Sequence, residues 1–552
     1  MTPQPATDAA PAGVQRSPSP AAGVANVADL VRIQAAARPD RIALVEGLEA
    51  ARTYTWAELD DLVERCAGGL AALGLLAGQR VTICLDTGVD FVTAYLAVLR
   101  AGLVAVPANP RSATGELVRQ LVDSGSRLVL ADAATVDTVR AAVSGVAKAL
   151  QGAEPAGRSP AGVPGVVVAG VPAQAGEREF DDLLVAGRPS VATPPDRERL
   201  AALLYTSGTS GAPRGAMLTH RALLTNLEQV AAIEPPVMRE DDVVLGLLPL
   251  FHIYGLNGVL GQVLNQGATI VLLNSFEPVG TLAAVRTLGL TNLPLAPPVL
   301  TAWVAQPDLA EQLSGVRMVV SGAAPLDQEQ IDAFEAASGI RVQQGYGLTE
   351  AAPVVTSTLT GPGGRSPTGS VGGPLPGVEI ELRDAAGSPV VDHDPGQVWI
   401  RGGNLFSGYW PDRLDAPGPD GWYATGDIGV IGDEGELILV DRLGDLVIVS
   451  GFNVYPAEVE DVIVAVPGVS EVAVIGMGDE LTGEAVIAYV VADPGDEASL
   501  RQAIRERCET SLARFKWPRE VVLVDELPHS ANGKIAKGRL RASARGETLG
   551  LT

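Results

Sequence analysis

Helical patterns alternate with short apolar runs along most of this 552-residue chain, and this alternation limits its possible folds more than any other feature. Leu59 to Leu73 has helical spacing, Val81 to Leu85 is a strand candidate, and Phe91 to Arg100 is helical again. The alternation recurs around Ala268 to Leu273 and Val316 to Gly322. Strands alternating with helices are typical of βαβ units with largely parallel sheets. The sequence therefore predicts an α/β fold.

The length predicts more than one domain. Near position 440 the pattern changes to short strands, a helix opening at Pro456 and a further helix from Ser499, which indicates a small α+β domain. The first residues are rich in Pro, Ala and Ser and lack the apolar core of a signal peptide. The predicted divisions are a disordered leader over 1–25, an N-terminal domain over 26–443 and a C-terminal domain over 444–552.

Charge and cysteine content exclude some classes of partner. The net charge of −25 argues against nucleic acid and an anionic membrane surface as main partners, because both reward basic patches. Cys66, Cys84 and Cys508 share no metal-ligand spacing, and Cys66 and Cys508 continue apolar helical stripes. We expect buried thiols and a cytoplasmic location.

The stretch from Val243 to Phe276 contains no Asp, Glu, Lys or Arg. It is long enough to cross a bilayer. It contains Pro249, His252 and Asn257 as well as five glycines. These residues favour a strand, a loop, a helix and a buried strand within a water-soluble domain. No transmembrane segment is expected.

Three motifs carry polar side chains after apolar runs. YTSGTSGAPRG, from Tyr205 to Gly215, could turn backbone N–H groups and hydroxyls onto a phosphate chain, although it is not a Walker A loop. QGYGLTE, from Gln344 to Glu350, could present hard oxygen ligands to a divalent cation, or Glu350 could cap a helix. GWYATGD ends at Asp427, an aspartate that a simple turn would also favour.

Lysine is rare in this chain, since only four of its 40 basic residues are lysines. Two of these, Lys534 and Lys537, lie close together near the C-terminus, and Lys534 directly follows Asn532-Gly533. A lysine kept in a sequence biased toward arginine indicates a task for a compact charge on a flexible arm.

The ordered series of motifs resembles the adenylate-forming superfamily, which includes acyl-CoA synthetases, peptide synthetase adenylation domains and beetle luciferases. The resemblance covers roughly residues 28 to 545. SGFNVYPAEVE and PLFHIYGL are most similar to the fatty acyl-CoA synthetase branch. The motifs that carry the resemblance to the superfamily are YTSGTSGAPRG, SGAAPL, QGYGLTE, YATGD, DRLGDLVIVSGFNVYPAEVE and NGK.

The resemblance implies both an architecture and a reaction. The large N-terminal domain would contain α/β subdomains with mostly parallel sheets and a β-barrel-like subdomain, and the C-terminal domain would be a mobile α+β lid. A carboxylic acid would react with ATP to give acyl-AMP and pyrophosphate, and CoA would then displace AMP. The implied cofactor and co-substrates are Mg²⁺, ATP and CoA.

The same resemblance assigns roles to individual residues. Lys534, Thr349 and Glu350 would be catalytic, with Lys534 bridging the α-phosphate and the acid, and Glu350 and Thr206 would hold Mg²⁺. Asp427 would accept from the ribose hydroxyls. The residues implied to bind ATP or AMP are Thr206, Ser207, Gly208, Thr209, Ser210, Gly211, Arg214, Gly322, Ala323, Ala324, Gln344, Gly345, Tyr346, Gly347, Asp427 and Arg442. The residues implied for CoA are Gly451, Phe452 and Lys516.

Two positions depart from the family pattern. The phosphate loop usually ends Pro-Lys-Gly, and here Arg214 replaces the lysine. The hinge position on which the lid turns is usually Asp or Lys, and here it is Gly444. Glycine still permits rotation, but the charge that could bias the lid is lost, so we expect an altered balance between the two half-reactions.

The acid is expected to be a medium- or long-chain fatty acid. No acidic residue lies between His252 and Phe276, where an amino-acid substrate would need a partner for its ammonium group. Gly255 and Gly258 could open a helix face for an acyl chain, or serve close helix packing. His252 is a candidate gate of the acyl pocket or a core histidine. An aryl acid remains an alternative.

Three rival functions stay open. The acceptor could be the phosphopantetheine of an acyl carrier protein acting in trans. A luciferase-like oxygenation has no specific support in the sequence. A non-catalytic nucleotide-binding protein is disfavoured because the key polar positions are retained.

Overall fold

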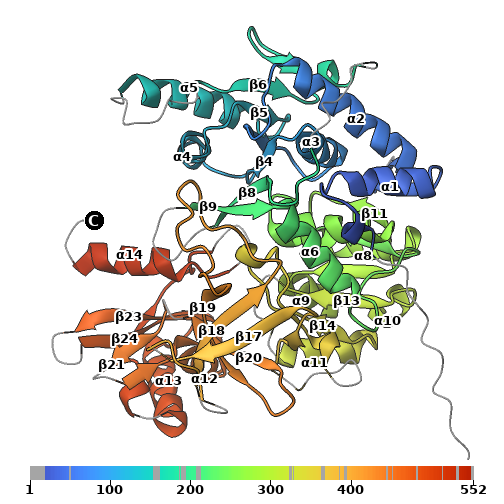
Figure 1. Cartoon of the computed structure of the whole chain (residues 1–552). Helices are drawn as coiled ribbons and strands as arrows, with labels where there is room; N and C mark the ends of the chain where they lie inside the picture. Colours follow the sequence, from blue (N-terminus) through green and yellow to red (C-terminus); the bar gives the residue numbers. More distant parts are fainter. Residues whose placement is uncertain are drawn as a thin grey trace, which may run out of the picture.

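Over the residues that it describes, the computed structural model contains five sheets and the helices that cover them. The described residues are 19–48, 51–152, 162–185, 187, 194–206, 213–322, 326, 328–361, 367, 369–384, 386–390, 394–442, 445–449, 452–479, 483–512, 514–529 and 534–548. The predicted α/β class with mostly parallel sheets, an antiparallel subdomain and a small C-terminal part is confirmed (Figure 1).

The first seven-stranded sheet has the order β7-β6-β5-β3-β4-β8-β9 and is parallel except for the pair β8–β9. In Figure 1 it lies at the top with its helices, in blue and teal. Its strands are β3 (Arg80–Cys84), β4 (Val104–Pro107), β5 (Leu128–Ala131), β6 (Gly165–Val168), β7 (Arg178–Glu179), β8 (Leu200–Thr206) and β9 (Arg214–Thr219). Its helices are α2 (Trp56–Ala72), α3 (Val89–Arg100), α4 (Thr114–Ser124), α5 (Val136–Gly152) and the 3-10 turn η2 (Phe180–Leu183).

The second seven-stranded sheet has the order β14-β13-β12-β10-β11-β1-β2, with only β1–β2 antiparallel. Its strands are β1 (Ile42–Glu46), β2 (Arg52–Thr55), β10 (Val243–Gly246), β11 (Thr269–Leu272), β12 (Asn292–Leu295), β13 (Met318–Ser321) and β14 (Val342–Gln344). The associated helices are α1 (Asp29–Ala37), α6 (His220–Ala231), η3 (Tyr254–Gly261), α7 (Gln262–Gln266), α8 (Pro278–Thr287), α9 (Pro297–Val304), α10 (Leu309–Gln312) and α11 (Gln328–Ser338).

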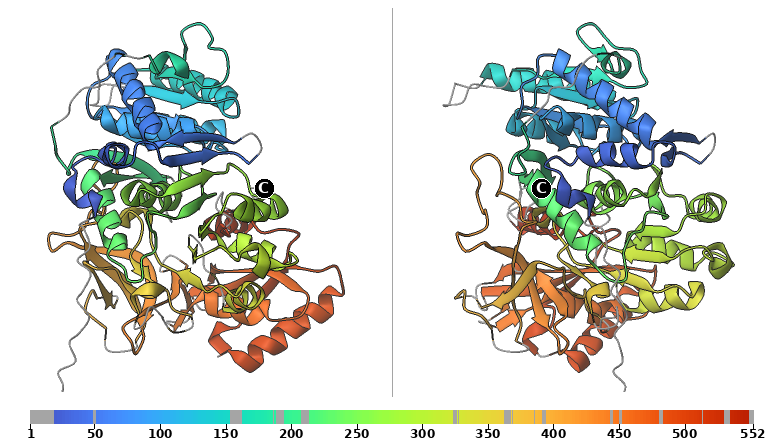
Figure 2. Two further views of the ribbon diagram at one scale, coloured as in Figure 1. Left: turned by 90° about the vertical axis from the view of Figure 1, so that its right-hand side faces the viewer. Right: turned by 45° about the vertical axis from the view of Figure 1, so that its right-hand side comes forward.

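Antiparallel structure follows. After η4 (Thr349–Ala351) come the pair β15 (Thr356–Ser357) and β16 (Gly373–Pro374), with η5 (Thr358–Thr360) between them. A four-stranded sheet, shown in orange in Figures 1 and 2, then adds its strands in chain order. These strands are β17 (Val378–Arg383), β18 (Gly396–Gly402), β19 (Trp422–Ile431) and β20 (Leu437–Arg442).

The C-terminal part has a five-stranded sheet and apolar clusters of its own. Both views of Figure 2 place it beside the orange sheet. Its elements are β21 (Val447–Val449), β22 (Phe452–Val454), α12 (Pro456–Val464), β23 (Val469–Asp479), β24 (Gly483–Ala492), α13 (Glu497–Ser511), η7 (Arg514–Lys516), β25 (Glu520–Leu523) and α14 (Lys537–Thr548).

Local sequence accounts for several of these elements. Thr55 and Glu58 form a capping box that starts α2. Helix α3 is buried along almost its whole length, as expected for a helix that is apolar on all sides. It lies in the largest apolar cluster, which includes Leu44 of β1 and Val81 of β3, so both seven-stranded sheets share one core.

The uncharged stretch from Val243 to Phe276 folds as predicted. It forms strand β10, a loop, the helices η3 and α7, and the buried strand β11. Among the residues that the structure describes, no helix is both long and apolar enough to cross a membrane. All three cysteines are free and buried, and burial raises the pKa of the Cys66 thiol to about 12.

The predicted leader over 1–25 is too long, because part of it is folded against the body of the protein. Pro20–Gly23 forms the 3-10 helix η1, and Ala21 is fully buried. The Ala21 N–H donates to Asn265 Oδ1 at 3.0 Å, across 244 positions of sequence. Pairing of this kind depends on a distant residue, which is why composition alone misplaced the boundary.

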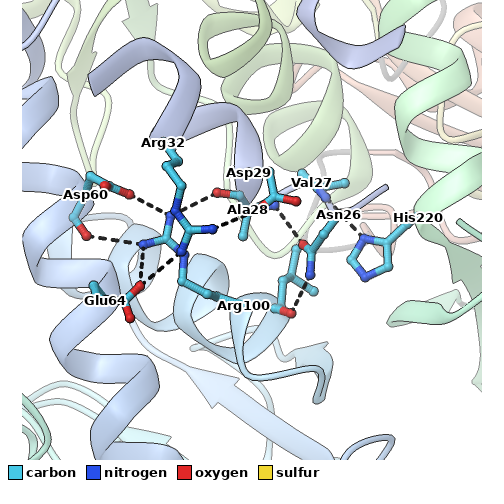
Figure 3. Close-up of polar contacts among 10 residues, drawn as sticks. Asn26, Val27, Ala28, Asp29, Arg32, Asp60, Glu64, Arg100 and His220 are labelled. Carbon is cyan, nitrogen blue, oxygen red and sulfur yellow. Dashed lines mark hydrogen bonds and ion pairs between the residues drawn. The ribbon is translucent and has the colours of Figure 1, made fainter. Parts of the chain in front are cut away.

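Figure 3 shows how the chain after η1 is held. Asn26 Nδ2 donates to Leu99 O at 2.8 Å, and the Val27 N–H donates to His220 Nδ1 at 3.2 Å. The buried Arg100 donates to Asp60 Oδ1 at 2.6 Å and to Ala28 O at 3.1 Å. A buried cation paired in this way ties the segment to α2 and α3.

His220 has to stay neutral to accept this hydrogen bond. Burial, and then the charge of Arg199, lower its pKa to about 4. Unfolded His220 takes up a proton below about pH 6.5 while the folded ring does not, so the free energy of unfolding falls as pH falls from about 6.5 toward 4. The full contribution is about 3 kcal/mol.

We therefore predict that His220→Asn flattens the dependence of stability on pH in this window. Asn Oδ1 can replace Nδ1 as the acceptor but does not titrate. Urea unfolding midpoints between pH 4.5 and 7 measure the effect, with His529→Asn as control because the His529 ring is exposed. Identical slopes in His220→Asn and the wild type would show that His220 does not carry the acid sensitivity.

Candidate active site

The loop that carries the QGYGLTE motif leaves strand β14 and is fixed by backbone hydrogen bonds. Gln344 is the last residue of β14, and Thr349 and Glu350 begin η4. The chain then returns beside the loop, where the Leu348 N–H donates to Pro353 O at 3.0 Å and the Val355 N–H donates to Tyr346 O at 2.9 Å. The predicted nucleotide-binding residues of this motif therefore lie on a rigid turn.

The two glycines of this loop are required by packing. A Cβ on Gly347 would lie 2.3 Å from Pro353 O, and one on Gly345 would lie 2.7 Å from Thr356 O. Real Cβ atoms do not approach backbone this closely, so any larger residue would push the loop away from its neighbour. The implied role of both glycines in binding ATP or AMP stays a prediction.

Tyr346 and Asp427 meet although 81 positions separate them. The Tyr346 hydroxyl donates to Asp427 Oδ2 at 2.5 Å, and both side chains are less than a tenth exposed. Asp427 lies on β19, directly opposite Arg442 on β20. Tyr346, implied to bind ATP or AMP, and Asp427, implied to bind the ribose, thus lie in contact.

Glu350 is also buried, and it is met by a tyrosine that the motifs did not identify. The Tyr409 hydroxyl donates to Glu350 Oε1, and burial followed by the charge of Glu350 raises the pKa of Tyr409. The phenol therefore remains a proton donor. Phe406 packs edge-on against Tyr409, with ring centroids 5.1 Å apart.

The predicted phosphate loop connects β8 to β9. Its first and last predicted residues, Thr206 and Arg214, face each other across these strands. The Arg214 guanidinium lies 3.8 Å from the centroid of the Tyr409 ring and bonds Asp415 at 2.8 Å. The predicted ligands Ser207, Gly208, Thr209, Ser210 and Gly211 lie outside the described residues, as do Ala323 and Ala324.

The two predicted magnesium ligands, Glu350 and Thr206, supply a carboxylate and a hydroxyl. Thr206 Oγ1 is buried and has no hydrogen-bond partner among the described residues. Mg²⁺ prefers hard oxygen ligands and is usually bound by one or two carboxylates together with substrate phosphates. Thr206 faces Arg214 across β8 and β9, Arg214 stacks on Tyr409, and Tyr409 donates to Glu350. A hydroxyl and a carboxylate match the chemistry of Mg²⁺, so Thr206 and Glu350 stay proposed ligands.

One predicted acyl-pocket residue, Gly258, and one predicted nucleotide-binding residue, Gly322, lie against the ring of Tyr254. A Cβ on Gly258 would lie 2.8 Å from Tyr254 Cδ2, and a Cβ on Gly322 would lie 3.1 Å from Tyr254 Cε1. The Tyr254 ring therefore lies between these glycines. A Cβ on Gly255 would lie 2.3 Å from Pro249 O, so close packing is sufficient to explain that glycine.

His252 lies within the electrostatic range of Lys534. Burial, and then the positive charge of Lys534, lower the pKa of His252 to about 4, so the ring is neutral near pH 7. His252 Nδ1 accepts the Tyr254 N–H at 3.3 Å. The lysine itself is exposed, in the segment before α14. The structure therefore brings the predicted catalytic lysine of the C-terminal part toward the predicted acyl pocket.

The structure describes only some of the residues that were predicted to bind CoA or to form the hinge. Lys516 Nζ lies 2.6 and 2.5 Å from the two carboxylate oxygens of Glu458, so its charge is balanced within the C-terminal part. Phe452 is the first residue of β22. Gly444 and Gly451 lie outside the described residues. Roles in CoA binding and lid rotation stay predictions.

Sequence reasoning missed Tyr409 and Tyr254. Tyr254 lies inside the PLFHIYGL segment, but the sequence did not indicate where its ring would lie. Tyr409 lies in NLFSGYW, a run of aromatic residues after β18 with no polar pattern that indicates chemistry. Its importance depends on contact with Glu350, 59 positions away.

We predict that Lys534→Ala raises the pKa of His252, since a nearby positive charge disfavours protonation of the ring. NMR titration of the His252 ring measures the change. Lys537→Ala is the matched control, because Lys537 pairs with Glu460 at 2.8 Å. An unchanged His252 pKa in Lys534→Ala would mean that the lysine does not approach the pocket in solution.

Two relatives among the curated proteins match nearly the whole chain. 4-Coumarate–CoA ligase 3 of Oryza sativa subsp. japonica is 34% identical over 514 residues, covering 91% of this chain and 89% of its own length. Long-chain-fatty-acid–CoA ligase FadD13 of Mycobacterium tuberculosis is 34% identical over 519 residues, covering 94% and 98%.

Solved structures show the same likeness. ATP-bound MatB from Rhodopseudomonas palustris has a TM-score of 0.81 at 32% identity, covering 94% of this chain and 99% of that one. The apo form of MatB, at the same identity and coverage, has a TM-score of 0.72. The backbone of this chain therefore superposes better on the ATP-bound form than on the apo form.

Two family models match consecutive parts of the chain. The model described as AMP-binding enzyme matches residues 31–410, and the one described as AMP-binding enzyme C-terminal domain matches residues 458–534. The predicted boundary at 443/444 falls between the two ranges. From the site geometry, the matched residues and relatives above 30% identity, we conclude that the chain belongs to the AMP-binding enzymes, the adenylate-forming superfamily that its motifs resemble.

Proposed function

We propose that this protein is an AMP-forming acid–CoA ligase that activates a carboxylic acid of apolar, uncharged body. The observations that carry the proposal are the buried hydrogen bonds of Tyr346 to Asp427 and of Tyr409 to Glu350, together with the positive charge of Lys534 acting on His252. In this proposal, Asp427 binds the nucleotide, Glu350 binds the cation and Lys534 binds the acid. The curated relatives described above are named CoA ligases, which supports CoA as the acceptor.

In the first half-reaction, a carboxylate oxygen of the acid attacks the α-phosphorus of ATP. A bond forms between that oxygen and the α-phosphorus, and the bond to the leaving pyrophosphate breaks. Lys534 would stabilise the charge that develops on the α-phosphate while it holds the acid carboxylate. Asp427 would fix the ribose, and Thr349 would donate to the α-phosphate.

Mg²⁺, when bound, would neutralise phosphate charge and orient the leaving pyrophosphate. Glu350 and Thr206 are the proposed protein ligands. Tyr346 contributes by keeping Asp427 in one orientation, because the hydrogen bond between them is short and buried.

In the second half-reaction, the CoA sulfur attacks the acyl carbon and AMP leaves with the bonding electrons. The thiol proton passes to solvent. A carrier-protein phosphopantetheine could supply the same thiol, and this acceptor remains the main alternative. Because His252 is neutral near pH 7, it carries no charge to pair with the acid carboxylate. Lys534 would then be the cationic partner of that carboxylate.

The first candidate acid is a medium- or long-chain fatty acid. The uncharged stretch from Val243 to Phe276 supplies buried apolar residues, including Leu256, Val259 and Leu260 of η3. A charged substrate body would meet no counter-charge there and would be costly to bury.

An aryl acid is the second candidate, and one observation favours it. The Tyr254 ring lies next to both Gly258 and Gly322, and an aryl acid bound beside it would stack on an apolar ring. One of the two curated relatives described above is named a 4-coumarate–CoA ligase.

Pyrophosphate release tests the function directly. With ATP and Mg²⁺, we expect release with a panel of acids from acetate through C8, C12 and C16 fatty acids to coumarate, and acyl-CoA as product when CoA is present. Lys534→Ala should slow release by about 100- to 1000-fold. Pyrophosphate release that does not change when CoA is added, with acyl-AMP remaining on the enzyme, would favour the carrier-protein acceptor.

Tyr254→Ala separates the two candidate acids. If the acid is aryl, we expect its KM to rise about tenfold, because the stacking face and its apolar area are lost. If the acid is a fatty acid, we expect the preferred chain to lengthen instead. Steady-state kinetics on coumarate and on C8 to C16 acids measure both, and no change for either acid would remove Tyr254 from the pocket.

A further inference from the structure

Residues 404–410, called here the bridging segment, lie between the strand that leaves the phosphate loop and the helix that carries Glu350. On one side the segment pairs with β9. These hydrogen bonds run from Ser407 N to Met217 O at 2.9 Å, from Met217 N to Gly408 O at 3.1 Å and from Trp410 N to Gly215 O at 2.8 Å. On the other side Phe406 N donates to Glu350 O at 2.8 Å, and Asn404 Nδ2 donates to Ala351 O at 2.8 Å. The segment therefore sets the position of Glu350 relative to β9.

Within the bridging segment, Tyr409 makes the side-chain contact to the carboxylate. Its hydroxyl donates to Glu350 Oε1, and its side chain is 9% exposed. Its backbone is held as well, since the Tyr409 N–H donates to Leu414 O at 2.8 Å. A carboxylate bound to a fixed phenol has a fixed orientation, and one of its oxygens is already engaged.

Arg214 holds the other face of this tyrosine. Its guanidinium lies 3.8 Å from the ring centroid, and its Nη1 lies 2.8 Å from Asp415 Oδ2. A planar guanidinium stacks on an aromatic ring and bonds a carboxylate at once, whereas a lysine ammonium is a strongly hydrated point charge. The arginine at this position of the phosphate loop is thus turned toward Tyr409 and Asp415.

We propose that Tyr409 is a positioning residue for the Glu350 carboxylate and that Arg214 acts through Tyr409 by holding its ring. This inference rests on the proposed function, because it takes Glu350 as a ligand of the cation that accompanies ATP. Groups that orient a metal ligand typically change metal affinity by about 10- to 100-fold when removed.

Tyr409→Phe tests the first part, with Mn²⁺ as the probe. We expect Mn²⁺ binding in the presence of a non-hydrolysable ATP analogue, followed by electron paramagnetic resonance, to weaken about tenfold. Binding of AMP without metal, measured by calorimetry, should stay unchanged because Tyr346 and Asp427 are intact. Equal Mn²⁺ affinity in Tyr409→Phe and the wild type, or an equal loss in AMP binding, would overturn the proposal.

Tyr95→Phe is the matched control. Tyr95 is a buried tyrosine on α3 whose hydroxyl has no hydrogen-bond partner within the described ranges. Its replacement removes the same atom far from Glu350, so Mn²⁺ binding should not change. A similar loss in Tyr95→Phe would mean that any missing buried phenol weakens the site, which would contradict a specific role for Tyr409.

Arg214→Lys tests the second part and does not depend on the fate of Tyr409→Phe. We expect about a threefold weakening of Mn²⁺ binding in the wild-type background, since the charge is kept and stacking is weakened. In the Tyr409→Phe background the same change should have a smaller effect, because coupled residues are not additive. Equal losses in both backgrounds would assign Arg214 to the phosphates instead.

The proposed function and this inference fail in different ways. A wild-type protein that binds neither AMP nor the ATP analogue contradicts the proposed function. A wild-type protein that binds both, beside a Tyr409→Phe variant that binds Mn²⁺ equally well, overturns only the inference.

Discussion

Two buried carboxylates, each met by a tyrosine hydroxyl, are the constraint on which the site depends. Burying a carboxylate is costly unless hydrogen bonds replace the water that it loses. Tyr346 bonds Asp427, and Tyr409 bonds Glu350. The loop after β14, the four-stranded sheet β17–β20 and the bridging segment must therefore meet at one place. The carboxylates are kept in water-poor surroundings, where the proposed interactions with a cation and a ribose would be stronger than at the surface.

We propose that the C-terminal part completes this site. Lys534 approaches His252, and the likeness to ATP-bound MatB exceeds the likeness to the apo form. Next to the predicted hinge, Asp445 pairs with Arg541 of α14 at 2.5 Å. Because α14 follows the segment that carries Lys534, this ion pair links the start of the C-terminal part to the proposed catalytic lysine.

Much of the fold could be predicted because its signals are local. Helix α2, strand β3, helix α3 and strand β11 lie within a few residues of the predicted ranges, since each follows from apolar periodicity and a cap or turn nearby. The end of the leader could not be predicted. Burial of Ala21 depends on Asn265 and on the strand and helix packing that brings them together.

The sequence by itself determined the class of fold, the family and the identity of most polar groups in the candidate site, because these follow from local pattern and from ordered motifs. Tertiary structure alone decided which groups meet. It placed Tyr254 between Gly258 and Gly322, and it turned Arg214 toward the ring of Tyr409. Contacts of this kind depend on how distant elements pack, and packing is set by the whole core rather than by the residues next to Tyr409 in the chain.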